Sequence, residues 1–273
     1  MRWDRGYRSD NIEDRRDEGG YGGGGIGLGG LGGLVALGSR FGIKGILIAL
    51  VIGGLLYGGV CGRSACQEAG SPAVTSTRSS TDQDEQSAFV GFVLDDVQSY
   101  WRKQLARYQT AKLVLFRNAI GSACGTATSA VGPFYCPLDR KVYIDLAFYD
   151  DLKQRFGAPG DFAQAYVIAH EVGHHVQNLS GLLGRGEVHQ IETELQADCL
   201  AGAWAKDAEA RGELEVGDID EALNAASQIG DDTIQRKTQG RVQPETWTHG
   251  SAAQRSGSFK RGLQGGPRAC GLE

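Results

Sequence analysis

Residues 161–179 read DFAQAYVIAHEVGHHVQNL, and this stretch decides both the fold and the chemistry that the chain can support. Apolar residues recur along it at helical spacing, among them Phe162, Val167 and Val176. Asp161 is a suitable N-cap at its beginning. The sequence therefore predicts a largely buried helix over residues 161–179.

The predicted helix contains the sequence His170-Glu171-Val172-Gly173-His174. Side chains four residues apart on a helix lie nearly above one another, so His170 and His174 can offer imidazole nitrogens to one metal ion. Glu171 lies beside them, where it can reach a metal-bound water. This spacing is typical of zinc hydrolases. His175 points to a different face, and we expect it to have a packing or polar role.

A catalytic zinc ion needs a third protein ligand and one open position. A glycine-containing turn follows the first helix, so a second predicted helix, residues 188–210, can return past it. In this second helix we choose Glu194 as the third ligand. Asp198 lies one turn further on, where it can accept a hydrogen bond from the free nitrogen of a ligand histidine. His189 is the main alternative as third ligand, because zinc also accepts imidazole readily.

The remaining periodicity predicts an α+β domain with a small antiparallel sheet against several helices. The expected helices cover residues 86–108, 161–179, 188–210, 218–238 and 251–262, and the expected strands are Lys112–Phe116 and Lys141–Asp145. The second strand is a candidate to bind an extended substrate by strand addition.

The N-terminal part of the chain differs from this domain in composition. Residues 1–40 mix charged residues with a Gly-rich stretch, and we expect a flexible cytosolic arm. Residues 41–61 contain an uncharged apolar run and are the expected transmembrane helix. Residues 62–85 are polar and are expected to form a linker, which leaves residues 86–273 as the folded domain.

The charges that flank the apolar run favour an N-terminus inside the cell. Arg40 and Lys44 precede the run, whereas Arg63 alone follows it closely. The expected location is the inner membrane, with a single pass and the folded domain on the extracytoplasmic (periplasmic) side. The net charge of -5 provides no basic surplus for a phosphate backbone, so nucleic acid is not expected as a partner.

The chain has 6 cysteines, an even number that suits an oxidising compartment. We expect Cys124 to pair with Cys136, because they bound one loop between the two predicted strands. A bond between Cys199 and Cys270 is a second candidate, and Cys61 with Cys66 is a third. Connectivity stays open at this point, because sequence alone does not determine it.

The zinc-site sequences resemble those of known peptidases. The His170-Glu171-x-x-His174 pattern, followed by Glu194-Leu195-Gln196-Ala197-Asp198, resembles the ligand pattern of the gluzincin metallopeptidases. The chain from about residue 86 to 270 also resembles the bacterial family called "putative neutral zinc metallopeptidases". The resembling stretches are Ser122–Gly125, Val131–Pro137, Val142–Leu146, the HEVGHHVQ run and Glu194–Trp204. This resemblance implies a zincin-like fold, a zinc cofactor and peptide hydrolysis.

A further short resemblance concerns Thr248-His249-Gly250-Ser251, with Arg255 beyond it. It is similar to a segment that follows the zinc helices in membrane-associated zinc peptidases, although those usually have Pro at the position of Gly250. The resemblance makes His249 a candidate to stabilise the oxyanion. A capping or surface role for this histidine is the alternative.

Together these features predict a membrane-anchored peptidase in which Zn²⁺ is held by His170, His174 and Glu194. Glu171 would be the general base, and the substrate a peptide or protein. One alternative is a zinc-binding membrane adaptor that binds peptides without hydrolysing them. Another is a structural membrane protein, whose zinc site would be closed by four protein ligands.

Overall fold

The computed structural model describes residues 1–18, 80–183 and 190–272. Residues 1–18 and the chain from residue 87 onward form one compact unit. The apolar run, the Gly-rich stretch, most of the expected linker and His189 lie outside the described residues. Among the residues that are described, no helix combines the length and the apolar character that a membrane span requires.

Within the described ranges, the main sheet has four strands, in the order β1-β2-β6-β5. The strands are β1 (Ile12–Asp14), β2 (Lys112–Phe116), β5 (Phe134–Cys136) and β6 (Lys141–Asp145). The β1–β2 and β2–β6 pairs are parallel, and the β5–β6 pair is antiparallel. A separate antiparallel hairpin consists of β3 (Ala119–Ser122) and β4 (Gly125–Thr128). The two strands predicted from sequence therefore form the centre of the sheet.

The prediction of an antiparallel sheet was wrong for its central strands. All but the first residue of both β2 and β6 are buried, as is typical of parallel strands covered on both faces. The residues between these strands hold β3, β4 and β5, which gives enough chain to bring β6 back in the same direction as β2. Because β6 is internal, the expectation that it adds a substrate strand was also wrong.

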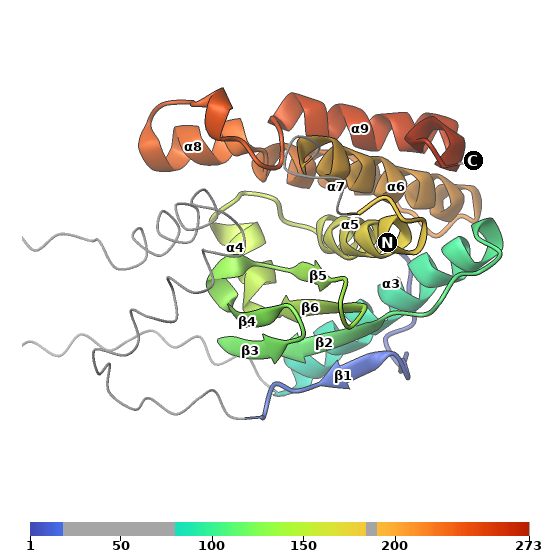
Figure 1. The fold of residues 1–273 in the computed structure, drawn as a ribbon. Coiled ribbons are helices and arrows are strands. Elements are labelled where there is room, and N and C mark those ends of the chain that lie inside the picture. The colour runs from blue at the N-terminus through green and yellow to red at the C-terminus, as the bar shows by residue number, and fades with distance from the viewer. Residues whose placement is uncertain (19–79, 184–189, 273) are drawn as a thin grey trace, which may run out of the picture. The chain divides into compact units, whose positions relative to one another are not determined.

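Seven helices of eight or more residues occur within the described ranges: α3 (Ser80–Gln104), α4 (Ala147–Gln154), α5 (Asp161–Leu179), α6 (Gln190–Ala210), α7 (Asp218–Gln228), α8 (Asp231–Gln239) and α9 (Ala252–Gly265). In Figure 1, α5 lies between the sheet and a group formed by α6, α7 and α9. The predicted bounds of α5 are confirmed. Because α3 begins at Ser80, the last six residues of the expected linker are helical.

The helix predicted over residues 218–238 is divided into α7 and α8 at Ile229 and Gly230. A Cβ atom on Gly230 would lie 2.3 Å from the backbone nitrogen of Ala252, so only glycine allows the start of α9 to pass at this point. The helix predicted over residues 251–262 begins at Ala252, with Ser251 as its N-cap in a capping box.

The N-cap of α5 is Gly160, and Asp161 is the first helical residue, so the prediction of Asp161 as N-cap was wrong by one position. Gly160 has a φ of 115°, which favours glycine. The carboxylate of Glu221 accepts a hydrogen bond from the backbone N–H of Phe162 at 3.1 Å. An acid from α7 therefore satisfies a free donor at the start of the metal-site helix.

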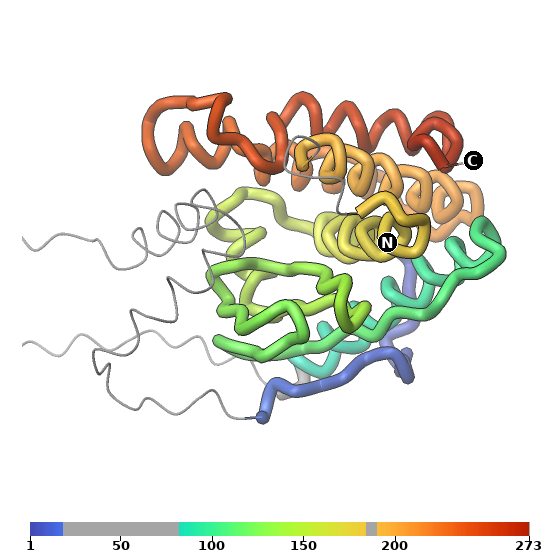
Figure 2. Tube along the Cα trace, viewed as in Figure 1, coloured from blue at the N-terminus to red at the C-terminus, as the bar shows by residue number. Residues whose placement is uncertain are grey.

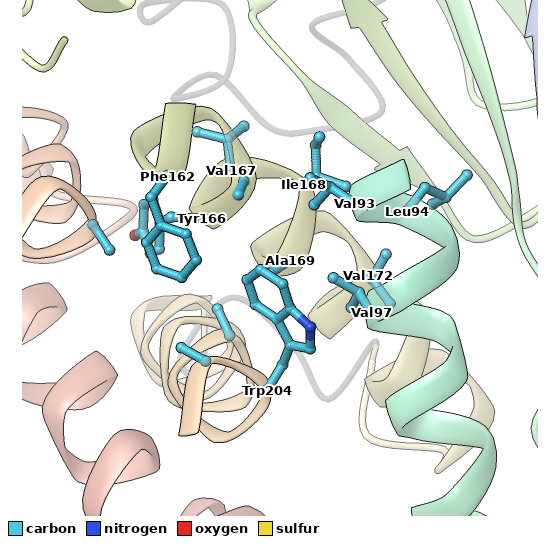
Figure 3. Close-up of a cluster of buried hydrophobic side chains, with 14 of the residues drawn as sticks. Val93, Leu94, Val97, Phe162, Tyr166, Val167, Ile168, Ala169, Val172 and Trp204 are labelled. Atoms are coloured by element: carbon cyan, nitrogen blue, oxygen red, sulfur yellow. The ribbon is translucent and has the colours of Figure 1, made fainter. Parts of the chain in front are cut away.

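The hydrophobic core surrounds α5. Figure 3 shows Val93 and Val97 of α3 beside Ile168 and Val172 of α5, with Trp204 of α6 nearby. These five side chains are fully buried, and each contributes about 1.5–3 kcal/mol or more of hydrophobic free energy relative to exposure. Packing from several directions therefore fixes the position of α5, which carries the histidines.

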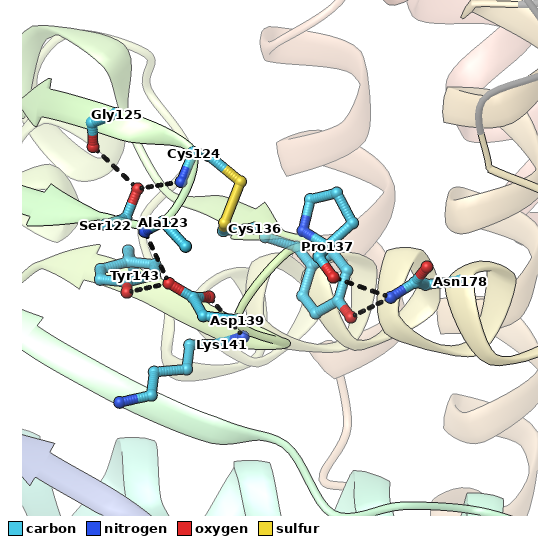
Figure 4. The surroundings of a disulfide bond; sticks show 11 residues. Ser122, Ala123, Cys124, Gly125, Cys136, Pro137, Asp139, Lys141, Tyr143 and Asn178 are labelled. Carbon is cyan, nitrogen blue, oxygen red and sulfur yellow. Dashed lines mark hydrogen bonds between the residues drawn. A yellow bond between two sulfur atoms is a disulfide. The ribbon is translucent and has the colours of Figure 1, made fainter.

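Two disulfides are present within the described residues, and both were among the predicted pairs. Cys61 and Cys66, the third candidate pair, lie outside those residues. Cys124 bonds to Cys136, which connects the β3–β4 turn to β5 (Figure 4). The carboxylate of Asp139 orders the neighbouring turn by accepting hydrogen bonds from Ala123 N and Tyr143 Oη, at 2.9 and 2.7 Å. The second disulfide joins Cys199 of α6 to Cys270 near the C-terminus.

Residues 1–18 are part of the folded unit, which corrects the expectation of a flexible arm over this segment. β1 adds in parallel to β2, and Figure 2 shows the blue tube of the segment running beside the green strands. Met1 is buried, and its α-amino group lies 2.7 Å from Asp161 and 3.3 Å from Asp218. This packing was not predicted from the sequence, because residues 1–18 contain few apolar residues among many charged ones.

Candidate metal and catalytic site

Two histidines of α5 and one glutamate of α6 meet at a single point. His170 Nε2 lies 3.2 Å from Glu194 Oε2, and His174 Nε2 lies 3.5 Å from Glu194 Oε1. One ligand atom from each of these residues lies within 4.8 Å of the others, which suits a shared metal ion. The structure therefore brings together the three residues that were predicted from the sequence as metal ligands.

The close approach of α6 to α5 depends on Gly173, between the two histidines. A Cβ atom at this position would lie 3.1 Å from the Cα and carbonyl oxygen of Ala197. Ala197 lies between Glu194 and Asp198, the two acids that face α5. Glycine in the His-Glu-x-Gly-His sequence thus lets α6 come near enough for its acids to reach the histidines.

His170 is oriented by a buried carboxylate. Its Nδ1 atom lies 2.8 Å from Oδ1 of Asp198, which is fully buried and also accepts a hydrogen bond from Tyr166 Oη. Arg255 of α9 donates to both oxygens of the same carboxylate, from Nε at 2.9 Å and from Nη2 at 3.0 Å. With Nδ1 donating to Asp198, the Nε2 lone pair of His170 faces Glu194 and is available to a metal.

His174 is oriented by Gln177 on the next turn of the same helix. The Nδ1 atom of His174 lies 2.8 Å from Gln177 Oε1. The amide nitrogen of Gln177 donates to Thr193 O at 2.7 Å and to Gln196 Oε1 at 3.0 Å, so α6 determines which way the amide faces. Gln177 was not identified from the sequence, although its position three residues after His174 is a usable signal.

The charges around the site favour a cation. Burial alone would lower the pKa of His170, but Asp198 and Glu194 raise it to about 10. Burial would raise the pKa of Glu194, yet His174 and His170 hold it well below its usual range. In the metal-free protein these carboxylates favour the protonated form of the imidazoles, and a bound metal ion would displace those protons.

Glu171, the expected general base, is buried beside the ligand group with 6% of its surface exposed. Burial raises its pKa, and the neighbouring His170 and His174 oppose that shift. The hydroxyl of Tyr149 is fully buried and has no hydrogen-bond partner among the described residues. Burial raises the pKa of Tyr149, and the charge of the Glu171 carboxylate adds to this shift. The site thus has a carboxyl group in an environment that suits proton transfer.

His249 is held in place by Asp231, the first residue of α8. One carboxylate oxygen of Asp231 accepts the backbone N–H groups of Thr248, His249 and Gly250 at 2.7, 2.7 and 3.0 Å. The other oxygen lies 3.4 Å from His249 Nδ1. Burial lowers the pKa of His249, but Asp231 and Glu194 together raise it. The charge of Glu194 thus affects the pKa of His249. The contact of His249 with a substrate stays a prediction.

His175 has the structural role that the sequence suggested. Its Nε2 atom donates to the carbonyl oxygen of Gln109 at 2.6 Å, and its Nδ1 atom accepts from Tyr135 Oη at 2.9 Å. Burial lowers the pKa of His175, and both ring nitrogens have hydrogen-bond partners. It connects α5 to β5 and to the chain before β2.

The donor set fits a catalytic zinc ion. Two imidazole nitrogens and one carboxylate oxygen match the His₂Glu ligand set of zinc hydrolases. Within the described ranges, no fourth His, Cys, Asp or Glu joins this group. A second group, formed by Asp161, Asp218 and Glu221, offers only oxygen ligands and lies against the α-amino group of Met1.

Comparison with known proteins assigns the chain to one family. The profile of the family described as "Putative neutral zinc metallopeptidase" matches residues 1–271. The chain is 44% identical to "Uncharacterized protein YpfJ" of Escherichia coli strain K12 over 294 residues, covering 99% of this chain and 98% of that protein. It is 46% identical to "Uncharacterized protein Rv2575" of Mycobacterium tuberculosis strain H37Rv over an alignment of 195 residues that covers 64% of this chain and 67% of that protein. No solved structure matches the chain.

Proposed function

Because the chain belongs to the neutral zinc metallopeptidase family, we propose that it hydrolyses peptide bonds at the site between α5 and α6. The observation that carries the proposal is the convergence of His170, His174 and Glu194. In the described chain these three ligands are not joined by a fourth, so a coordination position remains for water or a substrate carbonyl. A structural zinc site would instead have four protein ligands.

Each residue of the site would have its own role in the proposed hydrolysis. A zinc ion bound here would lower the pKa of a coordinated water and polarise the scissile carbonyl. The Glu171 carboxylate would take a proton from the attacking water and later donate it to the leaving amine. His249, which Asp231 holds and whose pKa Asp231 and Glu194 raise against the effect of burial, would donate a hydrogen bond to the developing oxyanion.

The substrate would lie along β5, at the edge of the main sheet. Among the described strands, β5 pairs only with β6, and we propose that an added strand pairs with its other edge. Tyr135 of β5 lies against His175, which places this edge next to the metal-site turn of α5. An extended peptide that pairs with β5 would pass the ligand group.

We propose a location for the domain from its cysteines. Both disulfides within the described chain support an oxidising compartment, hence the extracytoplasmic side. The apolar run of residues 45–60 supports association with the membrane. We retain both as proposals.

The proposal is tested with the purified full chain. Bound zinc is measured, and a mixed peptide library is incubated with the wild type, Glu171→Gln and Glu209→Gln, the last being an exposed control on α6. We expect zinc in all three proteins, cleavage by the wild type and Glu209→Gln, and a loss of at least about 100-fold in Glu171→Gln. Zinc binding without cleavage by the wild type would instead indicate a peptide-binding adaptor.

A further inference from the structure

The first 18 residues contribute a strand to the catalytic domain. Ile12, Glu13 and Asp14 of β1 lie in register with Leu113, Val114 and Leu115 of β2. β2 is central to the sheet, so β1 supplies its second neighbour. A salt bridge of 2.7 Å also joins Glu13 to Lys141 of β6, one strand further into the sheet. Backbone and side-chain contacts therefore both fix β1 to the domain.

The residues before β1 pack on α3 through aromatic side chains. Trp3 meets Phe89 edge to face, with ring centroids 5.2 Å apart. Tyr7 meets Phe92 in the same manner at 5.5 Å. Aromatic pairs in this geometry stabilise a protein by more than the buried area of the rings accounts for. The contact is thus a packed interface and not an incidental crossing of two segments.

Polar contacts and one glycine add specificity to this interface. The carboxylate of Asp95 on α3 accepts hydrogen bonds from Tyr7 Oη at 2.9 Å and from Asn11 Nδ2 at 2.6 Å. A Cβ atom on Gly91 of α3 would lie 2.9 Å from Ser9 Cβ. Glycine inside a helix is unfavourable, and here its missing side chain leaves the space that the N-terminal segment occupies.

We propose that residues 1–18 lie in the same compartment as the catalytic domain, as an integral part of it. The apolar run of residues 45–60 falls between the docked segment and α3. It is long enough for no more than one crossing of a bilayer, and one crossing would place β1 and β2 on opposite sides. The chain between residues 18 and 80 therefore begins and ends on the same side of the membrane. This replaces the cytosolic N-terminal arm expected from the flanking charges.

The first test measures the side of the membrane on which each part lies. Full-length Asp17→Cys and Val216→Cys variants, both at exposed positions, are treated with a membrane-impermeant maleimide in intact spheroplasts of a Gram-negative host and after lysis. The wild-type chain gives the background from its natural cysteines. We expect the two sites to be labelled under the same condition. Labelling of one in intact spheroplasts and of the other only after lysis would overturn the proposal.

The second test measures whether residues 1–18 pack on α3 in solution. Gly91→Ala in the full chain should lower Tm by a few degrees, because the added methyl group collides with Ser9. Gly257→Ala on α9 is the matched control, since a Cβ atom there meets nothing within 4 Å. That control should raise Tm by about 2–4 °C through improved helix propensity. An equal rise in Gly91→Ala would overturn the docking on which the proposal rests.

Discussion

The guanidinium of Arg255 donates from Nε to Oδ2 of Asp198 at 2.9 Å, and both side chains are almost completely buried. Arg255 lies in α9, far along the chain from the metal-site helices. Because Asp198 also accepts the Nδ1 hydrogen bond of His170, the arginine stabilises the charge that orients a proposed zinc ligand. Arg255 is a positioning residue that acts through Asp198.

The first prediction concerns this buried pair. Arg255→Met should destabilise the protein by about 3–5 kcal/mol, because it leaves Asp198 buried without its cation. It should also weaken zinc binding by about 10–100-fold, the usual effect of removing an outer partner of a metal ligand. The measurements are urea unfolding and competition with a zinc chelator.

Arg255→Lys serves as the graded control for that prediction. Lysine retains the charge but cannot donate to both carboxylate oxygens as arginine does, so its effect on zinc affinity should be intermediate. Zinc affinity in Arg255→Met equal to that of the wild type would contradict the positioning role.

The second prediction concerns pH. In the metal-free protein the pKa of His170 is raised to about 10 from an ordinary value near 6.5. A raised folded-state pKa contributes stability that is fully present below about pH 6.5 and is lost as pH rises towards 10. Stability with EDTA should therefore fall over this range, while zinc affinity should rise, because the bound proton no longer competes.

This behaviour is measured by thermal unfolding with EDTA and with excess zinc, at intervals from pH 6.5 to 10. The gap between the two Tm values should widen as pH increases. His170→Asn is the control, since it removes the titrating ring and should flatten the EDTA curve. A gap that narrows with rising pH would show that the site does not bind zinc through these imidazoles.

The third prediction concerns the hydroxyl of Tyr149, for which the described part of the chain offers no hydrogen-bond partner. A buried hydroxyl without a hydrogen bond costs about 1–3 kcal/mol, and phenylalanine preserves the shape of the ring. Tyr149→Phe should therefore raise the free energy of unfolding of the metal-free protein by about 1 kcal/mol. Urea unfolding checks this, with Tyr108→Phe as the control, because the Tyr108 hydroxyl donates to Gln98 and its loss should destabilise. A destabilised Tyr149→Phe would mean that the hydroxyl has a partner in solution.

The sequence predicted the parts of the site that depend on local spacing. His170, Glu171 and His174 follow from helical periodicity, and Glu194 with Asp198 follows from a helix that returns past them. Arg255 and Gln177 were not assigned these roles, because an arginine or glutamine is defined as a partner only by the tertiary contact it makes.

The arrangement of the strands also could be predicted only in part from the sequence. β2 and β6 were predicted with the bounds that the structure has, yet their parallel pairing was not. Direction depends on the path of the chain between them, which contains β3, β4 and β5 in a stretch that reads as a loop. β1 is short and rich in charge, so neither periodicity nor composition indicates that it completes the sheet.

The fourth prediction concerns Gly173 as the spacer between α5 and α6. Gly173→Ala places a methyl group 3.1 Å from backbone atoms of Ala197, which cannot move independently of α6. The helices must separate by a few tenths of an ångström, which carries Glu194 away from the histidines. We expect a loss of about 1–3 kcal/mol in stability from overpacking.

Zinc affinity should fall in the same Gly173→Ala variant, by about 10-fold if the displacement costs about 1.4 kcal/mol of binding free energy. Gly257→Ala, at a helical glycine with open space around it, separates this effect from a change in helix propensity and should leave zinc affinity unchanged. If Gly173→Ala binds zinc as tightly as Gly257→Ala does, the separation of α5 and α6 does not control the site, and the geometric role assigned to Gly173 is incorrect.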